Sequence, residues 1–491
     1  MKNSYQKFTK DVISIGATNL LLVLSTLIVI PLLTKTLGAH YFGIWSQAEV
    51  TIQLVLYIVG LGLPFALSRF LAAETNREKL QEGFYSAFTV VTLATLAASI
   101  LLIVFANPLA TAFFDGAIQI VRITGLIILV WSLDMMFLNL FRARRQMISY
   151  GIFMIAARYG EIGLIAYFVF NGHGILSVIL CLLAVRALLL LILFLFIKSQ
   201  IGIKRPHFYD IKEYLSFGLP TVPGDISAWI IASSDRYIIA YFLGTTSVGI
   251  YSAAYALGTI PLIFAAVLGI VLAPTLSKLY DEGRMSEVKI YLSYSLKYFL
   301  ALAIPFVFGA AILGKPVLGL FSTVEIASQG YFVVPMVALG VLLYGAFAVI
   351  YHTLVLVKKT RILGVIWIIA ALVNLGLNIM VVPYLGIMGE ALACLIAYSL
   401  VLGMGSYYSF RELTFDIDWR FIIKSLIASA IMALVIWIIS NLNVIITVLV
   451  GVAVYGVGLF LLKGFKREEI AFFSRLFSKN VPAASSDNKT E

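Results

Sequence analysis

Apolar residues along this chain gather into long unbroken runs that are separated by short polar segments. Runs of about 20 residues without strict alternation predict membrane-spanning α-helices, because a spanning strand of a barrel would alternate over about ten residues. The chain therefore predicts an all-α integral membrane protein. The fourteen predicted spans are 11–33, 44–71, 84–106, 118–141, 151–170, 174–197, 213–243, 248–276, 291–313, 330–357, 362–382, 386–409, 421–440 and 444–463.

Basic residues divide the loops between these spans into two sets. The N-terminus, every second loop and the C-terminal tail hold 28 of the 35 Lys and Arg residues, whereas the alternate loops hold only Lys35 and Lys315. Loops on the cytoplasmic side of a membrane are enriched in Lys and Arg. The pattern therefore predicts a multi-pass protein of the cell (inner) membrane with both termini in the cytoplasm, and it supports the count of fourteen.

The composition agrees with a membrane protein and does not require a nucleic-acid-binding function. The 491 residues are 62% apolar and 12% charged, with a mean hydropathy of +1.02. The net charge of +11 could suggest a nucleic-acid partner, but the distribution of the basic loops assigns it to topology and to anionic membrane lipid. Cys181 and Cys394 lie inside apolar runs, so we expect buried thiols and no disulfide. No cleavable signal peptide is predicted.

One ten-residue phrase occurs twice in the sequence. Residues 37–46 read LGAHYFGIWS and residues 243–252 read LGTTSVGIYS, with five identical positions. Each phrase joins two predicted spans on the outer side, and the copies are six spans apart. An even number of spans gives both copies the same orientation, so the sequence predicts a parallel repeat of two six-helix lobes.

The repeat defines the expected domains. They are an N-lobe (1–200), a C-lobe (201–410), two further helices (411–463), and a cytoplasmic amphipathic segment with a disordered tail (464–491). Lobes of this kind face each other across a central cavity and give alternating access by rocking, which favours a transporter over a channel. We expect the repeated phrase to be a structural corner that sets the hinge geometry without touching the substrate.

Two segments carry a resemblance to a known family. A Pro-interrupted span ending in Asp-Arg runs through FGLPTVPGDISAWIIASSDRYIIAYFLG into GIYSAAY, and a later segment reads NLGLNIMVVPYLGIMGEALACLIAYSL. Over about residues 8–410 the chain resembles the Wzx-type oligosaccharide flippases. These form part of the polysaccharide-exporter branch of the multidrug/oligosaccharidyl-lipid/polysaccharide superfamily.

The resemblance implies a transporter, not an enzyme, with no cofactor and no metal. It would flip a lipid-(di)phosphate-linked oligosaccharide from the cytoplasmic to the outer leaflet for surface polysaccharide biosynthesis. A cationic cavity, coupling to an ion such as H⁺ or Na⁺, and a glycan polymerase or glycosyltransferases as partners are implied in the same way.

Charged residues inside predicted spans are the candidate site, because an unpaired ionisable group at membrane depth is costly. Arg suits a diphosphate because its planar fork gives bidentate hydrogen bonds. Depth along the spans places Arg158 near Asp134 and Glu161 near Arg186, so these residues either form internal ion pairs or face the cavity. The candidate substrate ligands are Arg158, Arg186, Arg236 and Lys297.

Carboxylates are the candidate groups for ion coupling. Asp225 follows Pro220, Pro223 and Gly224, where a broken helix could build an ion site or Asp225 could cap the next helix. Asp235 sits next to Arg236 near the outer end of its span, where the two could be a local ion pair. The full set is Asp225, Glu161, Asp134 and Asp235.

Two other functions compete with flipping. A related MATE-type efflux transporter would favour an acidic cavity, whereas the candidate residues within the spans include at least as many basic as acidic groups. A membrane glycan polymerase or ligase would need a sizeable extramembrane loop with carboxylates or His, and the sequence contains neither such a loop nor a metal-ligand or nucleophile motif.

Overall fold

The computed structural model describes residues 2–72, 74 and 76–465, and within these residues the chain forms α-helices, one short 3₁₀ helix and no strand. The first half contains α1 (Lys2–Val59), α2 (Leu63–Phe70), α3 (Arg77–Val104), α4 (Ala106–Phe113), α5 (Ile118–Ala143), α6 (Met147–Phe170), α7 (Ile175–Ile201), α8 (Ile211–Gly218), the 3₁₀ helix η1 (Leu219–Thr221) and α9 (Val222–Ser233). The second half contains α10 (Asp235–Gly258), α11 (Leu262–Asp281), α12 (Met285–Phe321), α13 (Val324–Gly330), α14 (Val333–Ile350), α15 (His352–Leu356), α16 (Thr360–Leu385), α17 (Ile387–Glu412), α18 (Trp419–Ile438) and α19 (Val444–Leu461).

The helices confirm the predicted all-α membrane fold. Thirteen helical segments of the described chain are long and apolar enough to cross a membrane. The two longest have 46 and 48 residues and turn at Gly38 and Gly244, where φ is 83° and 80°. Dividing them there, and joining the second part of α10 to α11, reproduces the fourteen predicted spans. Only glycine adopts such a φ without steric cost, which explains the LG that begins both phrases.

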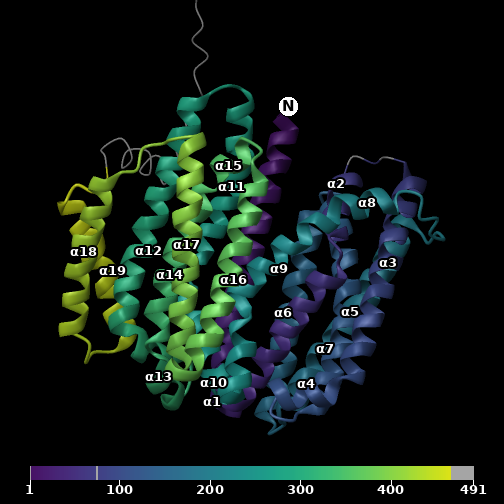
Figure 1. Cartoon of the computed structure of the whole chain (residues 1–491), viewed down its shortest axis with the longest axis horizontal. Coiled ribbons are helices and arrows are strands. Elements are labelled where there is room, and N and C mark those ends of the chain that lie inside the picture. Colours follow the sequence, from purple (N-terminus) through teal and green to yellow (C-terminus); the bar gives the residue numbers. More distant parts are fainter. Residues whose placement is uncertain (1, 73, 75, 466–491) are drawn as a thin grey trace, which may run out of the picture.

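The helices form two bundles that lie side by side (Figure 1). In one, α5 packs against α3 and α7, and α6 packs against α1 and α7. In the other, α14 packs against α12 and α17, and α16 packs against α17 and α9. The ribbons of the two bundles diverge toward the end of the molecule that carries α2, α8 and α15 (Figure 1). This is the end of the basic loops, which we call the basic end.

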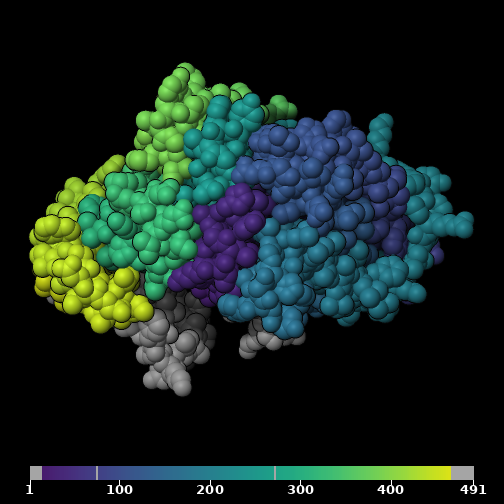
Figure 2. Space-filling model, turned by 90° about the horizontal axis from the view of Figure 1, so that it is seen from below, coloured from purple at the N-terminus to yellow at the C-terminus, as the bar shows by residue number. Residues whose placement is uncertain are grey.

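At the opposite end, the bundles meet through the repeated phrase. The second part of α1 crosses α10, and Figure 2 shows α1 in purple between the blue and the green-to-yellow halves. A Cβ on Gly43 would collide with the carbonyl oxygen of Thr245, and a Cβ on Gly249 with that of Ala39. The two contacts are equivalent under the repeat, because Gly249 and Thr245 lie 206 positions after Gly43 and Ala39.

A hydrogen bond of 2.7 Å joins Ser46 and Ser252, which occupy equivalent positions in the two copies of the phrase. Small residues at a helix crossing let the two backbones approach closely. The phrase forms a corner as predicted, and in addition the two copies make a close contact between the two halves. The expectation of a corner alone was therefore incomplete, because a sequence does not show that the two copies pack on each other.

The Pro-containing span at 213–243 is broken, as the sequence indicates. It consists of α8, η1 and α9 before it enters α10. Helix α8 packs on α2 of the other bundle, where Phe217 stacks on Phe65 with ring centroids 5.4 Å apart. The backbones of Gly62 and Gly218 touch at this point. This single span therefore contacts both bundles.

The last two described helices lie at the edge of the molecule. Helix α18 packs on α12 and on α19 (Figure 1). The predicted amphipathic segment and tail at 464–491 lie outside the described residues, apart from residues 464 and 465.

Candidate functional site

Five ionisable side chains meet at mid-depth in the first bundle. Arg158 and Arg186 are each the twelfth residue of α6 and α7, which have 24 and 27 residues. Three carboxylates accompany them, and we call the five residues the N-terminal cluster: Glu49 on α1, Asp134 on α5, Arg158 and Glu161 on α6, and Arg186 on α7.

Arg186 is tightly enclosed in this cluster. Its Nε lies 2.7 Å from Oε1 of Glu161, which confirms the predicted proximity of these two residues. Its guanidinium also stacks on the indole of Trp131, 3.6 Å from the ring centroid. Arg186 is 4% exposed and Glu161 is fully buried. A desolvated ion pair and a cation–π contact therefore enclose this guanidinium, although Nε and Oε1 do not meet in hydrogen-bond geometry.

Arg158 is held more loosely. Its Nε donates to the hydroxyl of Ser25 at 3.0 Å, and its Nη1 lies 3.4 Å from Oε2 of Glu161 and 3.9 Å from Oε1 of Glu49. The side chains of Arg158 and Glu49 are each 15% exposed. Two of these three contacts are long for charged groups, which usually approach to about 2.8 Å. This guanidinium can therefore exchange a partner.

Asp134 does not pair with Arg158 as the sequence suggested. It is fully buried, and its carboxylate oxygens make no hydrogen bond to the described residues. The charged groups next to it are Arg186 and Glu161. The prediction was wrong because depth along a helix does not specify the direction in which a side chain points.

A polar stripe extends from the N-terminal cluster toward the basic end. Glu49, Gln53 and Tyr57 follow at four-residue spacing on one face of α1, and Gln53 and Tyr57 are exposed. Tyr57 lies near Asp225, an exposed residue in the first turn of α9. Because α9 packs against α16 of the second bundle, this face of α1 looks toward the region between the bundles.

The second bundle has its own ionisable cluster. Oδ1 of Asp235 lies 2.8 Å from Nη1 of Arg236, so the predicted pair exists. It is buried in protein, however, and not exposed at an interface: Asp235 is 0% and Arg236 7% exposed. The Arg236 guanidinium stacks on Tyr255, 4.5 Å from the ring centroid.

Glu390 belongs to the same place, and we call Asp235, Arg236 and Glu390 the C-terminal cluster. Glu390 is fully buried in the first turn of α17 and neighbours Asp235, Arg236 and Asn378. Because Arg236 is already paired with Asp235, Glu390 has no cation of its own among the described residues. A buried carboxylate without a counter-charge is costly unless it holds a proton or another cation.

Lys297 does not join either cluster. Its Nζ lies 3.4 Å from Oδ2 of Asp418 and 4.9 Å from the ring centroid of Phe421. These contacts are between α12 and α18, on the side of the second bundle remote from the first (Figure 1). The structure thus places Lys297 against Asp418 and Phe421, away from both clusters, and its role as a substrate ligand stays a prediction.

Carboxylates outnumber arginines in both clusters, whereas the sequence suggested at least as many basic as acidic groups within the spans. Glu49 and Glu390 were missing from the residues predicted to form the site. The signal was available, because each is a lone carboxylate in an apolar run, in WSQAEVT and in GIMGEALA. The cost of a charge at membrane depth, which selected the other residues, applies equally to these two.

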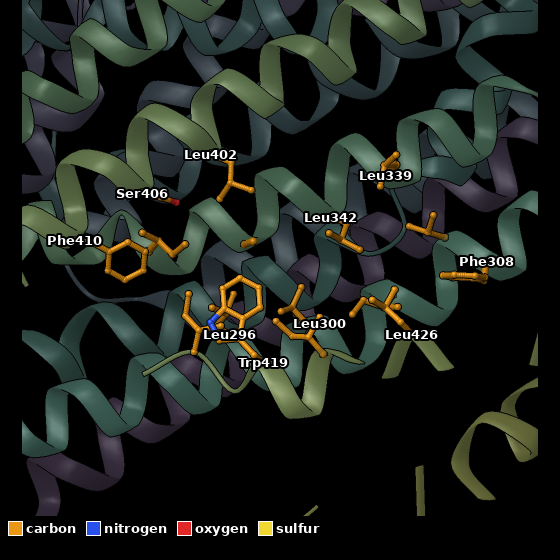
Figure 3. A pocket seen from close by; sticks show the side chains of 16 residues that line it. Leu296, Leu300, Phe308, Leu339, Leu342, Leu402, Ser406, Phe410, Trp419 and Leu426 are labelled. Atoms are coloured by element: carbon orange, nitrogen blue, oxygen red, sulfur yellow. The ribbon is translucent and has the colours of Figure 1, made fainter. Parts of the chain in front are cut away.

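A groove of about 380 Å³ lies between α12, α14, α17 and α18 (Figure 3). Its lining is almost entirely apolar, with Leu300, Leu342 and Leu402 along its length and Phe308 and Phe410 toward its two ends (Figure 3). Such a surface suits hydrocarbon and offers nothing to a charged head or a sugar. The groove is therefore not part of the candidate polar site.

Comparison with known proteins identifies related sequences. A family model described as "Polysaccharide biosynthesis protein" matches residues 8–280, which is more than half of the chain, and a second one, MatE, matches residues 220–380. "Probable flippase AglR" of Haloferax volcanii is 28% identical over 255 residues, 48% of this chain and 51% of that protein. "Succinoglycan biosynthesis transport protein ExoT" of Rhizobium meliloti is 27% identical over 300 residues, 59% of this chain and 57% of that protein. The chain thus spans about half the length of the curated relatives that it matches.

The fold is also found among solved structures. "Lipid II flippase MurJ, inward closed conformation" superposes with a TM-score of 0.76 at 19% identity, and the match covers 96% of this chain and all of that one. At this level of identity the likeness establishes the fold.

Proposed function

This chain belongs to the polysaccharide biosynthesis protein family, and we propose that it flips a lipid-(di)phosphate-linked oligosaccharide across the membrane by alternating access. The moving units are an N-lobe (1–200), which carries the N-terminal cluster, and a C-lobe (201–410), which carries the C-terminal cluster. Helices α18 and α19 (within 411–463) are an addition to the C-lobe. The protein acts as a transporter, and it carries out no bond-breaking chemistry.

The observation that carries the proposal is the state of Arg158. It is a partly exposed guanidinium at mid-depth, its contacts to two carboxylates are long, and it adjoins a polar stripe that looks toward the second bundle. Arg suits the planar, bidentate recognition of a phosphate. Arg186 supports this site by fixing Glu161, and the buried Arg236 stabilises the C-lobe.

The names of the relatives support the same substrate class. AglR is named a probable flippase and ExoT a succinoglycan biosynthesis transport protein, so we assign a lipid-linked glycan as the substrate class. The distribution of basic loops supports a location in the cell (inner) membrane with cytoplasmic termini. With the bundles crossing closely at the opposite end and diverging toward the basic end, substrate would enter from the basic end.

Ion coupling is the second part of the proposal. Each cluster has one carboxylate more than it has arginines, and Asp225 is an exposed carboxylate beside the stripe. These groups are suited to hold H⁺ or Na⁺ during the cycle. Glycosyltransferases or a glycan polymerase would act before and after transport.

Leaflet translocation in proteoliposomes tests the function. The vesicles would contain a fluorescent polyprenyl-diphosphate oligosaccharide, and a membrane-impermeant quencher would report how much of it changes leaflet. We expect translocation by the wild type and a loss of at least about tenfold for Arg158→Ala, the size of effect seen when a charge-assisted contact is removed. Translocation by Arg158→Ala at the wild-type rate would contradict the role of this arginine.

A MATE-like efflux function is the alternative that the carboxylate excess and the MatE match favour. The same vesicles decide between the two functions. Accumulation of a fluorescent organic cation driven by a pH gradient, without glycolipid translocation, would replace the flippase proposal with cation transport.

A further inference from the structure

Glu49 is the more loosely held of the two carboxylates that contact Arg158. Its Oε1 lies 3.9 Å from Nη1 of Arg158 and makes no hydrogen bond to any described residue. Glu161, by contrast, is in contact with both Arg158 and Arg186 and is fully buried. Glu49 therefore balances the charge of Arg158 without holding it in place.

The Glu49 side chain is partly accessible to an incoming ligand, although its Oε1 is buried. Glu49 and Arg158 have the same 15% exposure, and Glu49 stands at the head of the polar stripe with Gln53 and Tyr57. An anion that moves along this face of α1 reaches Glu49 and Arg158 together. Two anions cannot share the accessible side of one guanidinium without repelling each other, so the ligand and Glu49 compete.

The surroundings decide what happens to Glu49 after it is displaced. The charged groups that face it are Arg158 and Glu161 from α6 and Arg186 from α7, and Asp134 from α5 lies behind Arg186. From the side of α10, the neutral Tyr237 bonds to Thr51. Arg186 is already paired with Glu161, so none of the described cations is left unpaired for Glu49 once Arg158 is engaged.

We infer that the anionic head of the substrate displaces Glu49 from Arg158 and that the released carboxylate then takes up one proton from water. This inference rests on the proposed function, and it names the group through which that same site would be regulated. In the exchange, the carboxylate of Glu49 gains a proton while the phosphate oxygens gain the guanidinium. An ionised carboxylate left at membrane depth without a partner would be costly, and protonation removes that cost. Substrate binding and proton uptake are thereby linked, and release of the substrate returns the proton.

Binding of farnesyl diphosphate to the full-length protein in nanodiscs tests the exchange. Titration calorimetry in buffers of different protonation enthalpy counts the protons taken up. For the wild type we expect uptake of about one proton per probe, and an affinity that rises up to about tenfold for each unit by which the pH falls. For Glu49→Gln we expect no uptake and no such slope beyond that of the probe itself. Its affinity at high pH should be about two- to fivefold higher, because a competing, partly exposed ion pair is gone.

Matched variants keep the outcome interpretable. Glu49→Asp retains a carboxylate and should retain the proton uptake, which also serves if Glu49→Gln fails to fold. Glu325→Gln removes an exposed carboxylate at the opposite end of the molecule and should behave as the wild type. Undiminished proton uptake by a folded Glu49→Gln would overturn the exchange and leave the flippase proposal intact. A wild type that neither binds the probe nor translocates the glycolipid would overturn both.

Discussion

Arg158 in the first bundle and Arg236 in the second are held in different ways. Arg236 lies 2.8 Å from Asp235, stacks on Tyr255 and has a side chain that is 9% exposed. Arg158 has partners at 3.0, 3.4 and 3.9 Å and a side chain that is 15% exposed. A guanidinium that is sealed among its partners stabilises a fold, whereas one with long, shared contacts can change partners when a ligand arrives.

At the crossing of α1 and α10, by contrast, the two halves are alike. There, equivalent residues of the repeated phrase face each other, with Gly43 against Gly249 and Ser46 against Ser252. The repeat has thus kept the geometry of the contact in both halves, while the charged clusters differ. Four sets of substitutions, in order of decreasing expected effect, test the helix crossing and the two charged clusters separately.

A covalent link across the contact should have the largest effect. In a chain whose two buried cysteines are replaced by alanine, Ser46→Cys and Ser252→Cys place two thiols where the hydroxyl oxygens are 2.7 Å apart. Oxidation should abolish leaflet translocation because the halves can no longer separate, and a reductant should restore it. Full translocation by the oxidised protein would mean that this contact does not open during transport.

Removal of the shared carboxylate of the N-terminal cluster should come next. Glu161→Ala leaves Arg158 and Arg186 without their common partner at membrane depth, and we expect a loss of about 3–5 kcal/mol of stability. The measurement is denaturation of the purified protein in detergent or in bicelles. Glu161→Gln keeps the shape of the side chain, so its comparison with alanine separates the charge from the cavity.

An added methyl group at the crossing should have a smaller effect. Gly249→Ala forces the backbones of α1 and α10 apart and should cost about 1–3 kcal/mol. Gly403→Ala in α17 meets no atom within 4 Å and is the matched control. It should be neutral or slightly stabilising, since alanine favours a helix over glycine by about 1 kcal/mol. Equal effects at both positions would indicate that the close crossing is unimportant for stability.

Neutralisation of the C-terminal cluster should have the smallest effect. Glu390 is buried without a cation of its own among the described residues, so Glu390→Gln should change stability by less than about 1 kcal/mol. A loss as large as that of Glu161→Ala would show that Arg236 depends on Glu390 as well as on Asp235. In that case the two clusters would be alike in their energetics.

Much of the fold could be predicted from the sequence. Length and continuity of the apolar runs predicted the spans, and the LG of each phrase predicted corners that the structure places at Gly38 and Gly244. The proximity of Glu161 and Arg186 was predicted from depth alone, which succeeds where two neighbouring helices are antiparallel and in register. The same counting paired Asp134 with Arg158, which was wrong, whereas the role of Lys297 at the substrate stays a prediction.

The sequence by itself determined that this chain crosses the membrane many times, that its halves repeat, and which side chains carry charge at membrane depth. These properties follow from local hydrophobicity and spacing, because lipid accepts only apolar runs with satisfied backbones. Tertiary structure alone decided that the two copies of the phrase pack on each other and that α18 covers Lys297. It also decided that Glu49, not Asp134, stands beside Arg158. The physical reason is that rotation of a helix about its axis is set by the packing of its neighbours, and this rotation fixes the direction of every charge.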